Sequence, residues 1–131
     1  MLCYNRAMKF QVGGFMSKIK IKVTLKNKDE ENIQEQNAIL EDNKIKYKED
    51  KNTTVIWNEK EHTLYRETNE LRIKYPFQEK KTTEGTVELK QPPLEIKVPI
   101  HTKKLERKKH NVTIEFKVEE NEMLYCIEEI I

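Results

Sequence analysis

Apolar and polar side chains alternate along almost the whole of this chain from Lys18 onward. In the stretch KIKIKVTLK, residues 18–26, apolar side chains take every second position and lysines take most of the others. A period of two places successive side chains on opposite faces of an extended strand, so such a segment forms a half-buried β-strand. No long segment carries the 3.6-residue period of an amphipathic helix. The pattern therefore predicts an all-β protein in which each strand buries one face.

Short turns between the expected strands oppose residues of matching character. A turn at Asp42 and Asn43 has the residue chemistry of a two-residue hairpin loop, and it opposes Ala38 to Tyr47. The same turn makes residues 31–42, ENIQEQNAILED, a strand, although their propensity would also suit a short helix. Further turns over residues 58–61, 69–70, 92–93 and 119–122 oppose Trp57 to His62, Leu64 to Tyr75, Arg66 to Ile73, Leu89 to Ile96, and Phe116 to Tyr125. All these pairings agree on one continuous buried face.

Three of the chain's four prolines lie in KQPPLEIKVPIHTKKLE, residues 90–106, which otherwise alternates like a strand. Pro99 falls on the polar, outward parity, and it cannot donate a hydrogen bond to a neighbouring strand. It therefore marks a sheet edge, a bulge or the seam of an imperfectly closed barrel. The parity changes between Ile100 and Leu105, which predicts a bulge or bend there. Pro92 and Pro93 are interpreted as a turn.

The expected strands form an antiparallel meander. A flat sheet of this length would expose two edges and an uncovered apolar face, so closure is favoured. We predict a closed barrel of about 8–10 strands, with a two-sheet β-sandwich as the alternative.

Three stretches resemble the YwiB-like family of small bacterial proteins of unknown function. They are TLYRETNELRIKYPF (residues 63–77), TEGTVELKQPPLEIKVPIHTKKLE (83–106) and VTIEFKV (112–118). The resemblance spans roughly residues 18–129 and implies a calycin-like barrel, the architecture shared with lipocalins. The family has a Pro-Tyr-Gly turn where this chain reads Pro92-Pro93-Leu94. The resemblance supplies no activity.

Composition narrows the classes of partner. The 25 Lys and Arg residues nearly balance the 23 Asp and Glu residues, so net charge gives no general attraction to nucleic acid. We expect no membrane association, because no apolar run approaches the roughly 20 residues of a membrane helix. Cys3 and Cys126 are the only cysteines, which favours a reducing, cytoplasmic location.

The first 15 residues lack the alternation and contain two of the three glycines, Gly13 and Gly14. We interpret residues 1–15 as a disordered or non-native extension and residues 16–131 as a single β-barrel domain. The alternative is a genuine flexible N-terminal arm.

Arg66 is the candidate binding residue. Both hairpin registers that contain it place it on the face of the apolar residues, where an unpaired charge would be costly. It would need an internal carboxylate, ordered water or an anionic ligand, and its planar fork suits a carboxylate. Arg66 with Tyr47 and Tyr75 could therefore hold the acidic head of a small amphipathic ligand. The alternative places Arg66 near a barrel mouth, with its stem buried and its charge in water.

The aromatic residues of the buried face are Tyr47, Trp57, Tyr75, Phe77, Phe116 and Tyr125. They would line a ligand cavity or simply form the core. Trp57 and His62, which lies on the Arg66 face, complete the candidate ligand site. The three histidines are scattered, so we expect no metal site. No catalytic motif or cofactor-binding motif is present, so we expect a non-enzymatic protein without a cofactor.

A basic segment, residues 101–110, carries Lys103, Lys104, Arg107, Lys108 and Lys109. Such a hairpin could contact RNA phosphates or another protein, although it has no interleaved aromatic residues. Two functions therefore follow. The first is a barrel that binds a small amphipathic or acidic molecule inside. The second is a filled barrel that binds protein or RNA through residues 101–110.

Overall fold

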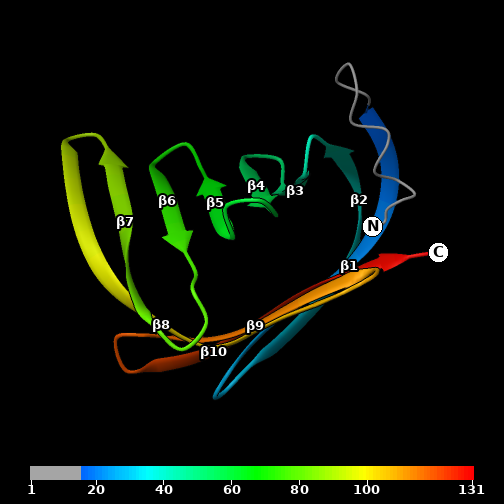
Figure 1. Cartoon of the computed structure of the whole chain (residues 1–131). Helices are drawn as coiled ribbons and strands as arrows, with labels where there is room; N and C mark the ends of the chain where they lie inside the picture. The colour runs from blue at the N-terminus through cyan, green and yellow to red at the C-terminus, as the bar shows by residue number, and fades with distance from the viewer. Residues whose placement is uncertain (1–15) are drawn as a thin grey trace.

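The computed structural model describes residues 16–131, which form ten β-strands joined by short turns (Figure 1). The strands are β1 (Met16–Asn27), β2 (Glu31–Glu41), β3 (Lys44–Asp50), β4 (Thr53–Asn58), β5 (Thr63–Glu67), β6 (Leu71–Pro76), β7 (Thr82–Lys90), β8 (Pro93–Lys108), β9 (Asn111–Val118) and β10 (Asn121–Ile130). The prediction about residues 1–15 lies outside the described residues.

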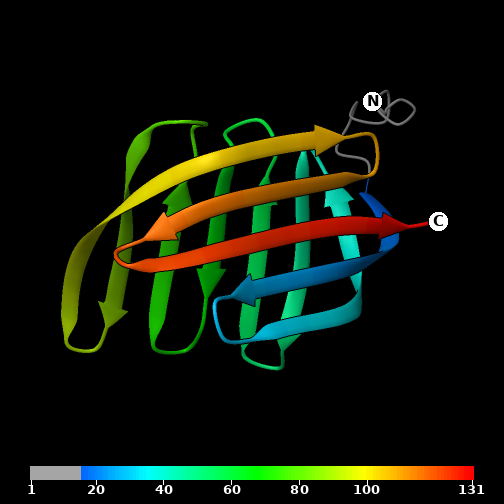
Figure 2. The ribbon, with the colours of Figure 1, turned by 90° about the horizontal axis from the view of Figure 1, so that it is seen from below.

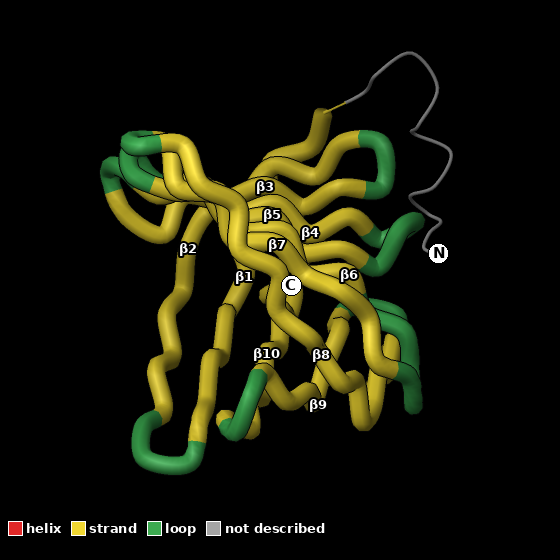
Figure 3. Tube along the Cα trace, turned by 90° about the vertical axis from the view of Figure 1, so that its left-hand side faces the viewer, coloured by secondary structure: helices red, strands yellow, loops and turns green. Residues whose placement is uncertain are grey.

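The strands follow one another as an antiparallel meander, and β1 pairs with β10 to close the barrel. The predicted all-β barrel is therefore confirmed, and the alternative of two separate sheets is ruled out. The barrel is flattened into two layers, in which β3–β7 cross β9, β10 and most of β1 (Figure 2). The long strands β2 and β8 bend from one layer into the other, and the β1–β2 turn projects away from β3–β7 (Figure 3).

The predicted hairpin registers are confirmed at two turns and wrong at three. Ala38 faces Tyr47 and Arg66 faces Ile73, as expected. Trp57 pairs with Leu64, Leu89 pairs with Leu94, and Phe116 pairs with Met123, each two residues from the predicted partner. The centre of each of these three turns lies one residue from its predicted position. The resulting shift of two residues leaves every side chain on the same face. The predicted buried face therefore survives the register errors.

The proline-containing strand β8 shows both predicted irregularities. Its pairing with β9 shifts register between Thr102 and Lys104, which is the predicted bulge. Pro99 pairs with Glu84 of β7, whereas pairing with β9 begins only at Ile100. Within residues 16–131, the first part of β8 thus has a neighbouring strand on one side only. Pro99 marks an edge, which was one of the three readings.

The core lies between the two layers. Its largest fully buried side chains are Trp57, Ile21, Ile100, Ile114, Val55 and Thr102. Tyr47, Phe77, Phe116 and Tyr125 are also buried, whereas Tyr75 is half-buried. Phe77 packs against both Phe116 and Trp57 in tilted geometry, with centroid separations of 4.9 Å and 6.3 Å. Most aromatic residues of the inner face are therefore core residues.

Gly85 is required by close packing. A Cβ atom on Gly85 would lie 2.5 Å from Ile100 Cδ1, 2.9 Å from Tyr75 Cδ1 and 3.2 Å from the Lys74 carbonyl oxygen. Because Ile100 is fully buried, its methyl group cannot move aside without displacing other core atoms. We expect Gly85→Ala to lower the free energy of unfolding by about 1–3 kcal/mol, measured by urea denaturation.

The matched rescue is Ile100→Val, which removes the Cδ1 methyl group that the new Cβ would meet. The double variant should be less destabilised than the sum of the two single variants. Strict additivity would show that Ile100 is not the residue that excludes a side chain at position 85.

Candidate functional site

Arg66 lies in a row of residues that crosses the inner face of five strands. Strand pairing aligns, in order from β3 to β7, Tyr47, Val55, Arg66, Ile73 and Val87, and the row continues to Ile96 of β8. The guanidinium is thus flanked by valine and isoleucine in the neighbouring strands.

The charge of Arg66 is balanced by Glu49 of β3. Arg66 Nη2 donates to Glu49 Oε1 at 2.6 Å, and Nε donates to the same oxygen at 3.1 Å. The two side chains are 39% and 29% exposed, so the pair sits at an opening of the barrel rather than deep inside. Two of the alternatives that the sequence left open for Arg66 are therefore both present: it has a carboxylate partner, and it lies near a mouth of the barrel. Glu49 was missed, although it shares the inward parity of Tyr47.

Tyr47 and Tyr125 are joined beside this ion pair. Their hydroxyl groups form a short hydrogen bond across the barrel, from β3 to β10. Burial raises the pKa of Tyr47 to about 12, although the hydrogen bond from Tyr125 offsets part of the effect. Burial also raises the pKa of Tyr125 well above its usual range, and the neighbouring Tyr47 adds to the shift. Both hydroxyl groups are therefore neutral at physiological pH, and Arg66 with Glu49 supplies the charge of this region.

Tyr75 lies on the next row of the same face, paired with Leu64. Burial, followed by the charge of Glu119, raises the pKa of its hydroxyl group, and the charge of Arg66 partly opposes that shift. Tyr75 is thus a neutral hydroxyl within electrostatic reach of Arg66. The structure brings the predicted residues Arg66, Tyr47 and Tyr75 together.

An aliphatic face extends from Arg66 to the outer end of the β7–β8 hairpin. It consists of two rows of paired residues, Leu71, Leu89 and Leu94 in one and Ile73, Val87 and Ile96 in the other. Leu94 and Ile96 are 52% and 45% exposed, and the other four are half-buried. We call these six residues the aliphatic face. It places apolar surface directly beside a charged pair at a barrel opening.

Trp57 and His62 form a separate group further along β4 and β5. Trp57 is fully buried, and its indole Nε1 donates to Glu59 Oε1 at 2.9 Å. His62 lies in the β4–β5 turn with a positive φ of 53°, and its ring stacks on Trp57 at a centroid distance of 6.3 Å. The indole is packed in the core and the imidazole stacks on it. Trp57 pairs with Leu64, whereas Arg66 pairs with Val55, so the two groups lie at least one row apart.

Carboxylates accompany much of the basic segment. Lys103 pairs with Glu122, Arg107 Nε lies 2.5 Å from Glu59 Oε2, and Lys104 Nζ lies 3.9 Å from Glu106 Oε1. Lys108 and Lys109 are exposed at the end of the hairpin. These pairings reduce the positive potential that the sequence alone would assign to this segment.

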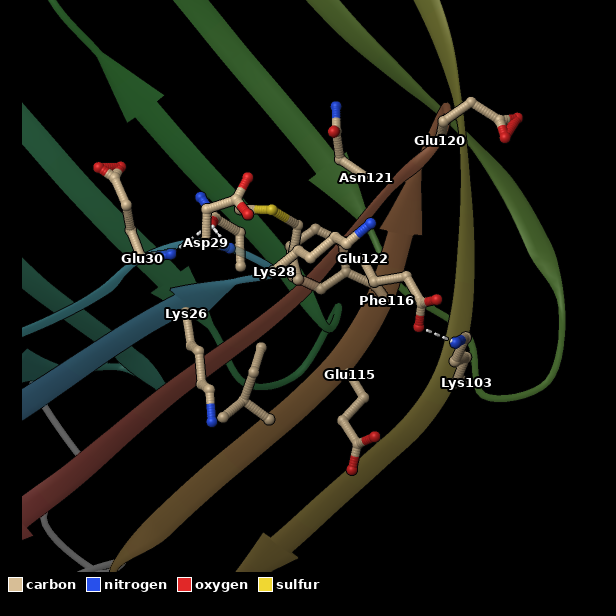
Figure 4. A pocket seen from close by; sticks show the side chains of 13 residues that line it. Lys26, Lys28, Asp29, Glu30, Lys103, Glu115, Phe116, Glu120, Asn121 and Glu122 are labelled. Carbon is tan, nitrogen blue, oxygen red and sulfur yellow. Dashed lines mark hydrogen bonds and ion pairs between the residues drawn. The ribbon is translucent and has the colours of Figure 1, made fainter.

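A groove of about 730 Å³ lies between the β1–β2 turn and the β9–β10 turn (Figure 4). Its lining residues carry charges of both signs around a few apolar side chains, and they include Lys26, Lys28, Asp29, Glu30, Lys103, Phe116, Glu122 and Met123. No sequence signal predicted it, because it depends on two turns that are distant along the chain. The mixed charges match no single ligand class.

Residues 16–131 contain neither a metal-ligating cluster nor a membrane-spanning helix. No group of three or more His, Cys, Asp or Glu side chains there is arranged to hold a metal ion. That part of the chain also contains no helix of the length and hydropathy needed to cross a membrane.

Comparison with known proteins establishes the fold. No family model matches the chain, and no curated protein sequence matches it. The crystal structure of the YwiB protein from Bacillus subtilis is similar, with a TM-score of 0.57 over 88% of this chain and 94% of that one. The sequence identity is 11%, so the likeness concerns the fold alone. The chain therefore has a YwiB-like fold, as its sequence resemblance predicted.

Proposed function

We propose that this protein is a non-enzymatic binding module for a small amphipathic molecule with an acidic head group. One observation carries the proposal: Arg66 lies at a barrel opening, in the same row as Ile73, Val87 and Ile96 of the aliphatic face. An amphipathic acid needs a cationic group for its head and an apolar surface for its chain, side by side.

The head group would bind the guanidinium of Arg66. Glu49 uses a single oxygen, Oε1, for both of its hydrogen bonds to Arg66. A guanidinium has five N–H donors, so it has capacity for a second acceptor. A ligand carboxylate there would form charge-assisted hydrogen bonds, which are roughly twice as strong as neutral ones.

The apolar part of the ligand would cover the aliphatic face. Leu94 and Ile96 are exposed, and removing such surface from water contributes roughly 25 cal/mol per Å². The ligand would thereby complete a core that the chain leaves uncovered at this opening. A hydrocarbon chain lying along one row would pass Ile73, Val87 and Ile96 in turn.

The charge pairing of the basic segment supports this function over RNA or protein binding through residues 101–110. Lys103, Lys104 and Arg107 each have a carboxylate partner. These carboxylates partly neutralise the positive charges that phosphate groups would contact. The exposed Lys108 and Lys109 make a small positive surface by comparison with a nucleic-acid interface.

Titration calorimetry with decanoate and decanol tests the proposal. We expect decanoate to bind more tightly than decanol, by roughly tenfold to a hundredfold, because only the acid interacts with the guanidinium charge. The double variant Arg66→Leu with Glu49→Leu removes both charges and leaves neither one unpaired. It should still bind decanol and should lose the preference for decanoate.

Arg72→Leu is the matched control, because Arg72 is an exposed arginine on the outer face that pairs with Glu67 and Glu88. It should retain the preference for decanoate. A wild-type protein that binds neither compound would overturn the proposal, and a preference that persists in the double variant would remove Arg66 from the site.

A further inference from the structure

The first part of β8 has a free edge within the described chain. Residues 93–99 pair with β7 on one side, and β9 joins on the other side only from Ile100 onward. In Figure 2 this part of β8 is the outermost strand of its layer. Exposed edges of this kind present unpaired backbone groups that can pair with another strand.

The direction of these backbone groups follows from Thr102. The Thr102 N–H donates to the Lys81 carbonyl group, and the Thr102 carbonyl group accepts from the Lys80 N–H, so both groups face the β7 side. Successive residues in a strand direct their backbone groups to opposite sides. The β7–β8 register is continuous from Lys90 to Thr82. Glu95, Lys97 and Pro99 therefore direct their backbone groups to the free edge.

The sequence of this edge is complementary to itself. It reads Pro-Leu-Glu-Ile-Lys-Val-Pro, residues 93–99, and its character is symmetric about Ile96. An antiparallel copy centred on Ile96 opposes Pro93 to Pro99, Leu94 to Val98, Glu95 to Lys97, and Ile96 to itself. Every opposed pair is thus matched in character, and each charged pair joins opposite charges.

We propose that two copies of this chain associate through this edge, with their β8 strands paired antiparallel about a two-fold axis at Ile96. Glu95 then exchanges both backbone hydrogen bonds with Lys97 of the partner subunit, and Lys97 does the same with Glu95 of the partner subunit. Isologous pairing of this kind is the common form of homodimer. The axis is perpendicular to the sheet, so the aliphatic faces of both copies lie on the same side.

The two prolines fix the register. Neither Pro93 nor Pro99 can donate a hydrogen bond, so the ladder ends at both. A shift of two residues in one direction would oppose Glu95 to Glu95, and a shift in the other would oppose Lys97 to Lys97. Either shift also pairs a proline with a residue that needs a donor. Like charges directly opposite are destabilising, so the register centred on Ile96 is selected.

The edge is short, so the association is expected to be reversible. Seven residues from each chain form an interface at the small end of the range for specific contacts, which corresponds to weak or transient complexes. The charged pairs lie on the solvent-facing side, so the dimer should weaken as salt is raised.

Charge reversal tests the proposal by sedimentation equilibrium of the full chain at roughly 1 to 100 micromolar. We expect the wild type to show a monomer–dimer equilibrium. Glu95→Lys places two lysine pairs across the axis and Lys97→Glu places two glutamate pairs there, so each should raise the dissociation constant at least about tenfold. The double variant Glu95→Lys with Lys97→Glu restores opposite pairs and should recover dimerisation. Mixing the two single variants should produce the heterodimer.

The charge-reversal variants should fold like the wild type. Glu95 and Lys97 are exposed, and the residues opposite them in β7 are Glu88 and Thr86, so neither change buries a charge. Lys97→Glu also removes an exposed ion pair between Lys97 and Glu84, which contributes little to stability. Lys74→Glu, on the exposed face of β6 whose two edges are both paired, is the matched control and should leave association unchanged. A wild type that stays monomeric throughout, or a dimer that both single reversals leave unaffected, would overturn the proposal.

Discussion

Replacing Trp57 with alanine is expected to lower the free energy of unfolding by about 3–5 kcal/mol, the largest effect of any single change considered. The indole is fully buried and packs against Phe77 and His62. Truncation removes its dispersion contacts and leaves a cavity between the two layers. It also deprives Glu59, the residue that links Trp57 to Arg107, of its indole donor.

Urea denaturation of three variants separates packing from hydrogen bonding. Trp57→Phe keeps most of the buried ring and loses the N–H donor, so it should cost less than Trp57→Ala. Glu59→Gln keeps an acceptor for the indole and loses the Arg107 ion pair, which should cost less than about 1 kcal/mol because Arg107 is exposed. Equal costs for Trp57→Ala and Trp57→Phe would contradict a core centred on this ring.

Alkaline pH is expected to destabilise the protein through its paired tyrosines. Burial raises the pKa of Tyr47 to about 12 from 10.0, so the folded state keeps its proton where the unfolded state has lost it. The unfolded state then binds fewer protons, and stability falls as pH rises. The contribution of Tyr47 to this loss begins near pH 10 and levels off near pH 12. A difference of about two pKa units corresponds to about 3 kcal/mol at Tyr47, and Tyr125 shifts in the same direction.

Denaturant unfolding measured across this pH range checks the expectation. Tyr47→Phe removes one titrating group and should flatten the alkaline loss of stability. Tyr65→Phe is the comparison: partial burial and Glu61 also raise the pKa of Tyr65, but it is less buried than Tyr47, so this variant should flatten the alkaline loss less than Tyr47→Phe does. An alkaline loss that is the same in Tyr47→Phe and in the wild type would show that the buried tyrosine pair does not govern it.

Residue alternation predicted the faces of the strands better than their pairing. The parity of Arg66 or Trp57 is fixed by neighbours along its own strand, whereas its partner depends on where the turn is centred. A turn whose centre moves by one residue along the chain shifts the pairing by two and leaves parity intact. Trp57 was therefore placed on the correct face opposite the wrong residue, His62 in place of Leu64.

The ion pairs could not be predicted in the same way. Glu49 was one of many glutamates, and which residue it faces across the sheet depends on the irregularity between Lys48 and Asp50, which alternation does not reveal. Arg107 lies near the end of β8 and pairs with Glu59 of the β4–β5 turn, which is distant in the sequence. Parity would have marked Glu49 as inward, because it lies two residues after Tyr47. The groove between the β1–β2 and β9–β10 turns depends likewise on barrel closure.

The prolines of residues 90–106 indicated where strand pairing is interrupted. Pro99 indicated an edge, a bulge or a seam, and the structure shows an edge at Pro99 and a bulge after Thr102. The self-complementary charges between Pro93 and Pro99 become meaningful only once that edge is known to be free. The same hairpin carries the aliphatic face, so its uncovered apolar residues and its unpaired edge lie together.

Native mass spectrometry of the protein isolated from its natural source tests the proposed binding function most directly. A retained small acidic molecule is the predicted result, and the double variant Arg66→Leu with Glu49→Leu should lose it. Protein that carries no ligand from its source, and that also fails to bind decanoate, would contradict the account.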